Sequence, residues 1–157
     1  MPRLTVSGRE ETPEERADRN LSELLQELRV AIPGIQVLFA FLLVVPFSER
    51  FDELSDAQEK LYFAVLLCVA LSTALLVAPT VGHRILFRRQ EKEYLVTVAN
   101  RLALSGLFVL AVAMCGVIAL ISGFIFGTTT MVVTTIGTAI TFSGLWYAGP
   151  LLRRARD

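Results

Sequence analysis

Charged and apolar residues alternate in long blocks along the chain. Its 157 residues include 15 Lys plus Arg and 15 Asp plus Glu. These charges all lie in four blocks: 1–29, 49–60, 84–101 and 153–157. The stretches between the blocks carry no charge: 30–48, 61–83 and 102–152. Uncharged apolar runs of about 18 or more residues are typical of helices that cross a membrane. The pattern therefore predicts membrane spans and excludes a soluble fold or a secreted disulfide scaffold.

The three uncharged stretches predict four helices. The first two are each long enough to cross a hydrocarbon core of about 30 Å at 1.5 Å per residue. The third, 102–152, is too long for one helix and fits two. Its break should fall between Gly123 and Thr130, because two glycines weaken the helix there and three threonines can cap a new one. We predict spans at about 30–48, 60–81, 102–125 and 129–152.

The predicted fold class is all-α, an integral membrane four-helix bundle with an N-terminal amphipathic cytoplasmic segment. Residues 1–19 are predicted as a flexible polar tail and 20–157 as the membrane domain. Thr12, Pro13 and Glu15 have the spacing of a helix start. Leucines then recur at helical spacing from Leu21, so this segment either lies along the inner membrane surface or continues into the first span.

Lys and Arg predict the orientation of the spans. From the N-terminus, the segments outside the spans carry five, two, five, zero and three of them. Both termini and the loop 84–101 are therefore expected in the cytoplasm, with the acidic loop 49–60 outside. The first 29 residues have no apolar core of a cleavable signal peptide. The expected location is the inner (cytoplasmic) membrane, with several passes.

Little in the sequence points to enzyme chemistry. The chain has one His and two Cys, and it contains no phosphate loop, Cys-x-x-Cys or paired-His motif. We expect no enzyme activity, catalytic residue, metal or cofactor. Because long uncharged apolar runs make up much of the chain, we also expect no nucleic-acid partner. No charged residue lies in the middle of a predicted span, which argues against an ion-coupled carrier. Cys68 and Cys115 are expected to be buried free thiols.

Charged residues near the inner ends of the spans form one candidate site. Glu23 and Glu27 lie one helical turn apart and repel each other unless a cation is near. Arg84 and Arg88 follow the second span on the same side of the membrane. These four residues predict an ion-pair clasp. Its function would be a cytoplasmic gate or the docking of a partner. The alternative is a structural link between helix ends or a solvated face. His83 adds a candidate pH-sensitive group, with a structural hydrogen bond as the alternative.

Small and hydroxyl residues mark the last two helices. The fourth helix carries Thr134, Gly137, Thr138 and Thr141, and the third carries Gly116, Ala119 and Gly123. Such faces let helices pack closely and hydrogen-bond across the contact, although a hydroxyl stripe could instead line a pore. We predict that the two faces pack against each other. Aromatic rings at Tyr62, Trp146 and Tyr147 are expected at the membrane interfaces.

Three motifs resemble one protein family. They are Glu27-Leu28-Arg29-Val30, the run Gln36 to Leu43 with Pro46-Phe47, and Ala78-Pro79 followed by His83-Arg84-Ile85-Leu86-Phe87-Arg88. They are similar to the bacterial domain-of-unknown-function family 6328, small four-helix inner-membrane proteins. The resemblance covers roughly 20–155. It implies the four spans and no particular activity.

The expected function is that of a non-enzymatic integral membrane protein, a helical bundle in the lipid bilayer that self-associates as a homo-oligomer or binds another membrane protein. The alternative is an oligomeric channel or small-solute transporter with a hydroxyl-lined path.

The orientation can be tested with location-sensitive tags. Tags at either terminus and near Gln90 should report the cytoplasm, because the flanking segments carry most of the Lys and Arg. A tag near Asp56 should report the outside. A C-terminal tag found outside would rule out an even number of spans.

Overall fold

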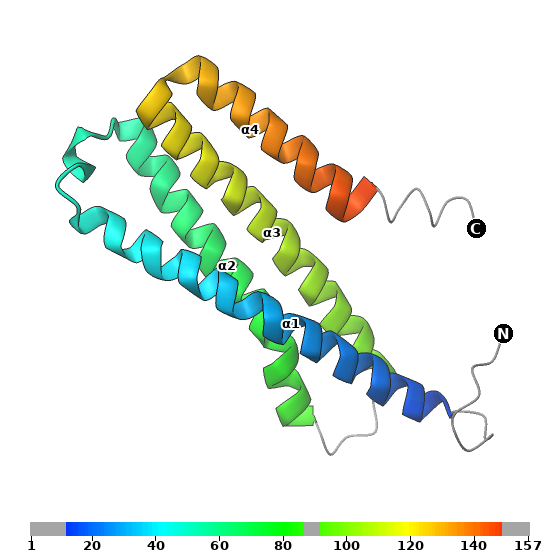
Figure 1. Cartoon of the computed structure of the whole chain (residues 1–157). Coiled ribbons are helices and arrows are strands. Elements are labelled where there is room, and N and C mark those ends of the chain that lie inside the picture. The colour runs from blue at the N-terminus through cyan, green and yellow to red at the C-terminus, as the bar shows by residue number, and fades with distance from the viewer. Residues whose placement is uncertain (1–11, 87–91, 149–157) are drawn as a thin grey trace.

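In the computed structural model, which describes residues 12–86 and 92–148, the apolar stretches fold into helices (Figure 1). The four long ones are α1 (Pro13–Val44), α2 (Asp56–Leu86), α3 (Lys92–Phe126) and α4 (Thr128–Phe142). Two single 3-10 turns, η1 (Val45–Phe47) and η2 (Phe51–Glu53), join α1 to α2, and a π-helical segment, η3 (Ser143–Ala148), continues α4. The described residues contain no strand. The all-α prediction is confirmed.

Helix α1 begins where its capping residues predict. The Thr12 amide donates to Glu15 Oε2 at 2.9 Å, and the Glu15 amide donates to Thr12 Oγ1 at 3.3 Å. This reciprocal pair satisfies two amides that a helix start leaves without partners. Residues 13–19, predicted as part of a polar tail, are therefore helical, while residues 1–11 lie outside the described part. The helix continues through Pro33 to Val44 as one rod of 32 residues.

Helix α2 contains a proline, Pro79, near its C-terminal end. It continues through Pro79 to Leu86, and Figure 1 shows its last turns leaving the line of the helix. A proline lacks the amide hydrogen that would bond the carbonyl four residues earlier. Neighbouring helices make such an interruption tolerable in a membrane span. Pro79 is one of the most deeply buried side chains described, so other parts of the bundle cover it at this point.

Helices α2 and α3 form the centre of the bundle. Val69, Ser72 and Leu76 of α2 are fully buried, and each lies one turn after the last. A Cβ added at Gly106 of α3 would lie 2.7 Å from Leu76 Cγ, so only glycine allows this approach. The Ser72 hydroxyl donates to the Gly106 carbonyl at 2.8 Å. Helices α1 and α4 pack around this central pair (Figure 1).

A single glycine reverses the chain between α3 and α4. Gly127 has φ +84, a left-handed conformation that side chains other than glycine rarely adopt. Its amide donates to the Gly123 carbonyl at 3.2 Å, and its carbonyl accepts from the Met131 amide at 3.1 Å. The break predicted between 123 and 130 is thus confirmed. Helices α3 and α4 become antiparallel neighbours.

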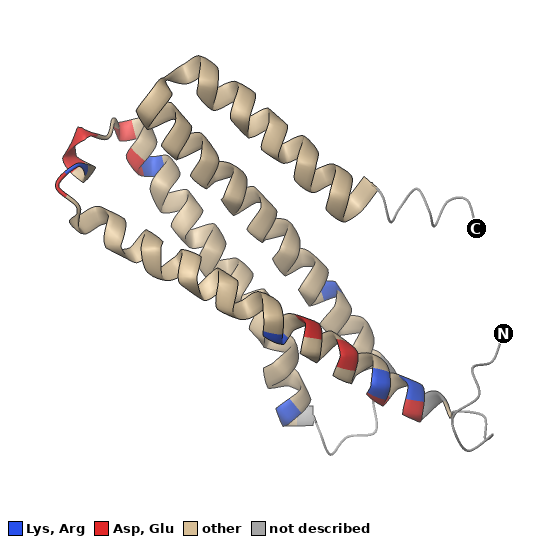
Figure 2. Cartoon of the chain, viewed as in Figure 1, with Lys and Arg blue, Asp and Glu red and all other residues tan. Residues whose placement is uncertain are grey.

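The charged side chains of the described residues lie toward the ends of the bundle. Figure 2 shows Lys, Arg, Asp and Glu gathered at its two ends. The described part of the chain has four helical stretches that are long and apolar enough to cross a membrane: Glu15–Phe47, Asp56–Ile85, Tyr94–Phe126 and Thr128–Ala148. Their exposed surfaces carry large apolar side chains such as Phe41, Phe63 and Ile118. The chain is a multi-pass membrane protein.

The contact at Gly106 predicts a sharp difference between two Gly→Ala variants. Gly106→Ala should destabilise the fold by about 1–3 kcal/mol, as overpacking of a filled core does, because the buried Leu76 has nowhere to move. Gly34→Ala is the matched control, since an added Cβ there has nothing within 4 Å. It should be neutral, or stabilising by up to about 1 kcal/mol. Unfolding in detergent measures both, and equal stability of the two variants would contradict the close contact.

Candidate functional site

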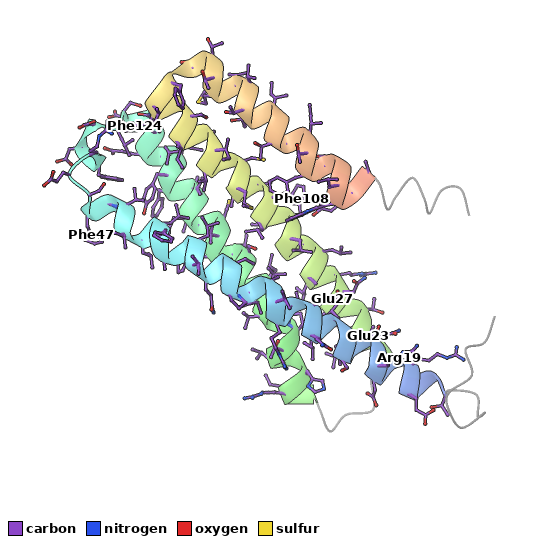
Figure 3. All side chains as sticks on the ribbon, in the orientation of Figure 1. Arg19, Glu23, Glu27, Phe47, Phe108 and Phe124 are labelled. Atoms are coloured by element: carbon purple, nitrogen blue, oxygen red, sulfur yellow. The ribbon has the colours of Figure 1, made fainter. Side chains whose placement is uncertain are left out.

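The predicted charged clasp brings fewer residues together than expected. Figure 3 shows Arg19, Glu23 and Glu27 following one another along α1. Glu23 pairs with Arg19 on its own helix, Oε1 to Nε at 3.8 Å. Within residues 12–86 and 92–148, no ion pair joins Glu23 or Glu27 to Arg84. Arg88 lies outside the described residues.

The crossing of the helices explains this difference. Figure 1 shows α1 passing over α2, so that the N-terminal part of α1 and the last turns of α2 diverge. Arg84 therefore ends exposed on a separate side. The sequence predicted that Glu23, Glu27 and Arg84 lie at the same end of the bundle. It did not predict that α1 crosses α2, which separates them. The exposed pair of Arg19 and Glu23 adds little stability.

His83 lies half-buried in the last turn of α2. The neighbouring Gly82 packs toward α3, because a Cβ there would lie 3.7 Å from Leu95 Cδ1. The histidine thus lies where the ends of two helices meet. Its pH sensitivity remains a prediction.

The small face of α4 meets α3 at two points. The Thr134 hydroxyl donates to Ser122 Oγ at 2.9 Å, while also lying 2.8 Å from the Thr130 carbonyl of its own helix. A Cβ at Gly123 would lie 3.0 Å from Met131 Sδ. Ser122 and Gly123 therefore let α4 approach α3 near the turn.

The rest of that face does not pack as predicted. Gly116 faces α2, where an added Cβ would collide with Val65, rather than α4. The reason is that α3 lies between α2 and α4 and divides its small residues between both neighbours (Figure 1). An added Cβ at Gly137 would have nothing within 4 Å, and Thr141 is exposed. Ala119 is half-buried.

The threonine hydroxyls of α4 bond mainly within their own helix. The Thr138 hydroxyl donates to the Thr134 carbonyl at 2.8 Å, and the Thr141 hydroxyl donates to the Gly137 carbonyl at 2.9 Å. A hydroxyl bonded in this way is satisfied without a partner helix or water. These two hydroxyls therefore do not hold α4 against a neighbouring helix.

The opposite end of the bundle carries a cluster that the sequence did not reveal. The Tyr62 hydroxyl donates to the Leu42 carbonyl at 2.6 Å, and the Tyr62 and Phe51 rings meet edge to face at 5.5 Å. The Arg50 guanidinium lies 4.8 Å from the ring centroid of Phe124 at the end of α3 (Figure 3). This cluster ties the α1–α2 connection to the bundle.

Tyr62 adds a second bond at the C-terminal end of α1. The Leu42 carbonyl accepts from the Val45 amide, which caps the helix, and also from the Tyr62 hydroxyl. Tyr62 is 4% exposed, so tertiary packing rather than lipid surrounds its ring. Its position at the membrane interface stays a prediction.

Metal-ligating groups are scattered. The described residues contain no group of three or more His, Cys, Asp or Glu that could hold a metal ion. Cys68 and Cys115 are free thiols, each half-buried.

Comparison with known proteins yields a family. The sequence model of DUF6328, described as a family of unknown function, matches residues 10–150. No curated protein and no solved structure matches the chain.

The contact between Ser122 and Thr134 predicts a measurable coupling. In a double-mutant cycle with Ser122→Ala and Thr134→Val, the coupling should be about 0.6 kcal/mol, the average for a hydrogen bond between membrane helices. Pairing Ser122→Ala with Thr141→Val is the control and should give no coupling, since Thr141 bonds only its own helix. Unfolding in detergent measures both cycles. A coupling indistinguishable from the control would mean that the two hydroxyls act independently.

Proposed function

The chain belongs to the DUF6328 family, a family of unknown function, and on that premise we propose that it is a non-enzymatic protein of the inner membrane that works through helix association. Its partner is a second copy of the chain. Both termini lie in the cytoplasm, as the excess of Lys and Arg around them favours. The acidic connection between α1 and α2 lies outside.

The state of α4 carries the proposal. Among the described elements, α4 contacts only α3 and the segment η3 that continues it, and none of its residues is buried. The side away from α3 exposes Val133, Ile136 and Ile140 at 65%, 55% and 67%. Gly137 and Gly144 are open, since nothing lies within 4 Å of an added Cβ at either position. A helix with so little internal contact has a large surface for another helix.

The composition of that surface favours a helix over lipid chains. The exposed surface of α2 includes Phe63, Leu67 and Leu71, which suit contact with lipid. On α4, glycines instead allow the backbone of a second helix to approach closely, and close packing is a main drive for helix association in lipid. A second copy is favoured because most soluble oligomers consist of identical subunits.

The alternative function is a channel or transporter. Of the hydroxyls predicted to line its path, those of Thr138 and Thr141 donate to carbonyls of α4 and that of Thr134 contacts Ser122 of α3. The Thr135 hydroxyl has no partner among the described residues, but its oxygen is buried. The centre of the bundle also offers little polarity, since Ser72, the buried polar residue there, is satisfied by the Gly106 carbonyl. These observations favour helix association.

The oligomeric state of a glycine variant tests the proposal. The wild type should form an oligomer in detergent and in vesicles, measured by light scattering and by counting subunits with photobleaching. Replacing both Gly137 and Gly144 by Leu should yield monomers with unchanged helix content and unfolding temperature, because no neighbouring atom is displaced. Gly34→Leu, at an equally open glycine of α1, is the matched control and should leave the oligomer intact.

Two outcomes would overturn this function. A monomeric wild type would remove helix self-association. Solute flux through wild-type vesicles that Thr141→Val abolishes, without loss of fold, would instead favour the channel.

A further inference from the structure

The inner end of the α3–α4 pair carries an aromatic cluster on an unusual helix segment. The six residues of η3 are π-helical, a geometry that is rare and frequently found at functional sites. Within it, the Tyr147 ring meets Phe108 of α3 at 6.3 Å, and the Trp146 ring meets Phe142 at 4.8 Å, both edge to face. Figure 3 places Phe108 between α3 and α4.

The register of α3 against α4 and η3 determines the position of this cluster. Ser122 contacts Thr134 near the turn, and Phe108 contacts Tyr147 farther from it. Phe108 lies fourteen residues before Ser122, and Tyr147 lies thirteen residues after Thr134. The helices therefore remain in contact from the turn to η3. Residues of α3 before Phe108 continue past the last described turn of η3.

The Tyr147 hydroxyl is buried without a partner. Its oxygen exposes less than 1 Å², and no hydrogen-bond partner lies within reach among the described residues. A buried tyrosine hydroxyl normally finds one, because leaving it without a bond costs free energy. Beside it, Trp146 is 37% exposed and carries a second donor, the indole N–H. Two donors at one place favour a ligand with acceptor oxygens.

An arginine lies on the same face of α3. Arg101, Leu104 and Phe108 follow one another at helical spacing, and all three are exposed. Arg101 begins the charge-free part of α3 and thus marks the inner boundary of the span. No described carboxylate forms an ion pair with it. From Phe108 to Arg101, this exposed face of α3 therefore changes from apolar to cationic.

We propose that this face binds an anionic phospholipid of the inner leaflet. The phosphate lies at Arg101, whose planar guanidinium can bond two phosphate oxygens at once. The ester oxygens accept from the Tyr147 hydroxyl and the Trp146 indole. One acyl chain follows Leu104 and Phe108. Each part of the lipid thereby meets a group of matching chemistry.

The spacing of these groups matches the layers of a bilayer. Arg101 and Phe108 are seven residues apart, about 10 Å at 1.5 Å per residue. The headgroup layer on each side of the hydrocarbon core is roughly 5–8 Å thick. Arg101 therefore reaches the phosphates while Phe108 stays among the chains. Arg29 and Arg84 lie at the same end of the bundle, but neither is aligned with an aromatic pair and an unpartnered hydroxyl.

Trp146 makes the site directly observable, because it is the single tryptophan of the chain. The full-length protein is reconstituted in phosphatidylcholine vesicles doped with either brominated phosphatidylglycerol or brominated phosphatidylcholine. Bromine quenches tryptophan fluorescence on contact. The wild type should prefer phosphatidylglycerol about fivefold, the free energy of one arginine at an anionic surface expressed as an affinity ratio.

Variants assign that preference to the site. Arg101→Gln should bring the quenching ratio of the two lipids close to one, and Tyr147→Phe should weaken quenching by both lipids, because the ester oxygens lose a donor. Arg84→Gln, the matched control at the end of α2, should leave the ratio unchanged. Circular dichroism confirms that each variant keeps its helices.

Three results would overturn the proposal. They are equal quenching by both lipids in the wild type, a preference that survives Arg101→Gln, and quenching that is insensitive to Tyr147→Phe. Dilution in excess lipid makes the measurement independent of self-association. A monomeric protein can therefore still bind the lipid, and an oligomer can lack it.

Discussion

The approach of α2 to α3 at Gly106 is the contact on which the rest of the bundle depends. Lipid chains are as apolar as leucine, so membrane helices gain little from hiding apolar surface and associate through close packing and hydrogen bonds. Here Leu76 fills the space that a side chain at Gly106 would need, and Ser72 bonds the Gly106 carbonyl across the same contact. Packing and hydrogen bonding thus coincide at one point. Helices α1 and α4 are then placed by what this pair leaves open.

Backbone groups without partners explain the contacts around that centre. Proline removes an amide from a helix, and a carbonyl in lipid cannot turn to water for a replacement. At the end of α1 next to Pro46, the Leu42 carbonyl accepts from both the Val45 amide and the Tyr62 hydroxyl. The hydroxyls of Thr138 and Thr141 in α4 bond carbonyls of their own helix. The hydroxyls of Thr135 and Tyr147 are the contrasting cases among the described residues, and that of Tyr147 lies in the proposed lipid site.

The division of contacts within the bundle connects the fold to the proposed function. The small residues of α3 pack against two neighbouring helices: Gly116 lies against α2 and Gly123 lies against α4. Helix α4, at the edge, contacts one helix and keeps Gly137 and Gly144 open. The central pair therefore provides stability, whereas the edge helix offers surface. The proposed self-association and the proposed lipid binding involve different parts of that edge: the side of α4 away from α3, and the end that carries η3.

The sequence by itself determined the helices and the charge-free spans between their ends, because the cost of charge in hydrocarbon and the conformation of Gly127 are local properties. It also predicted the start of α1 from Thr12 and Glu15. Which helix faces which was decided only by the tertiary structure. Gly116 and Gly123 share a face by periodicity, yet they meet different helices. The charges near Glu27 and Arg84 share one end of the bundle, yet the crossing of α1 over α2 separates them (Figure 1). The spacing of residues along a helix specifies only which side of that helix each residue is on. Which neighbouring helix lies on that side depends on how all four helices pack.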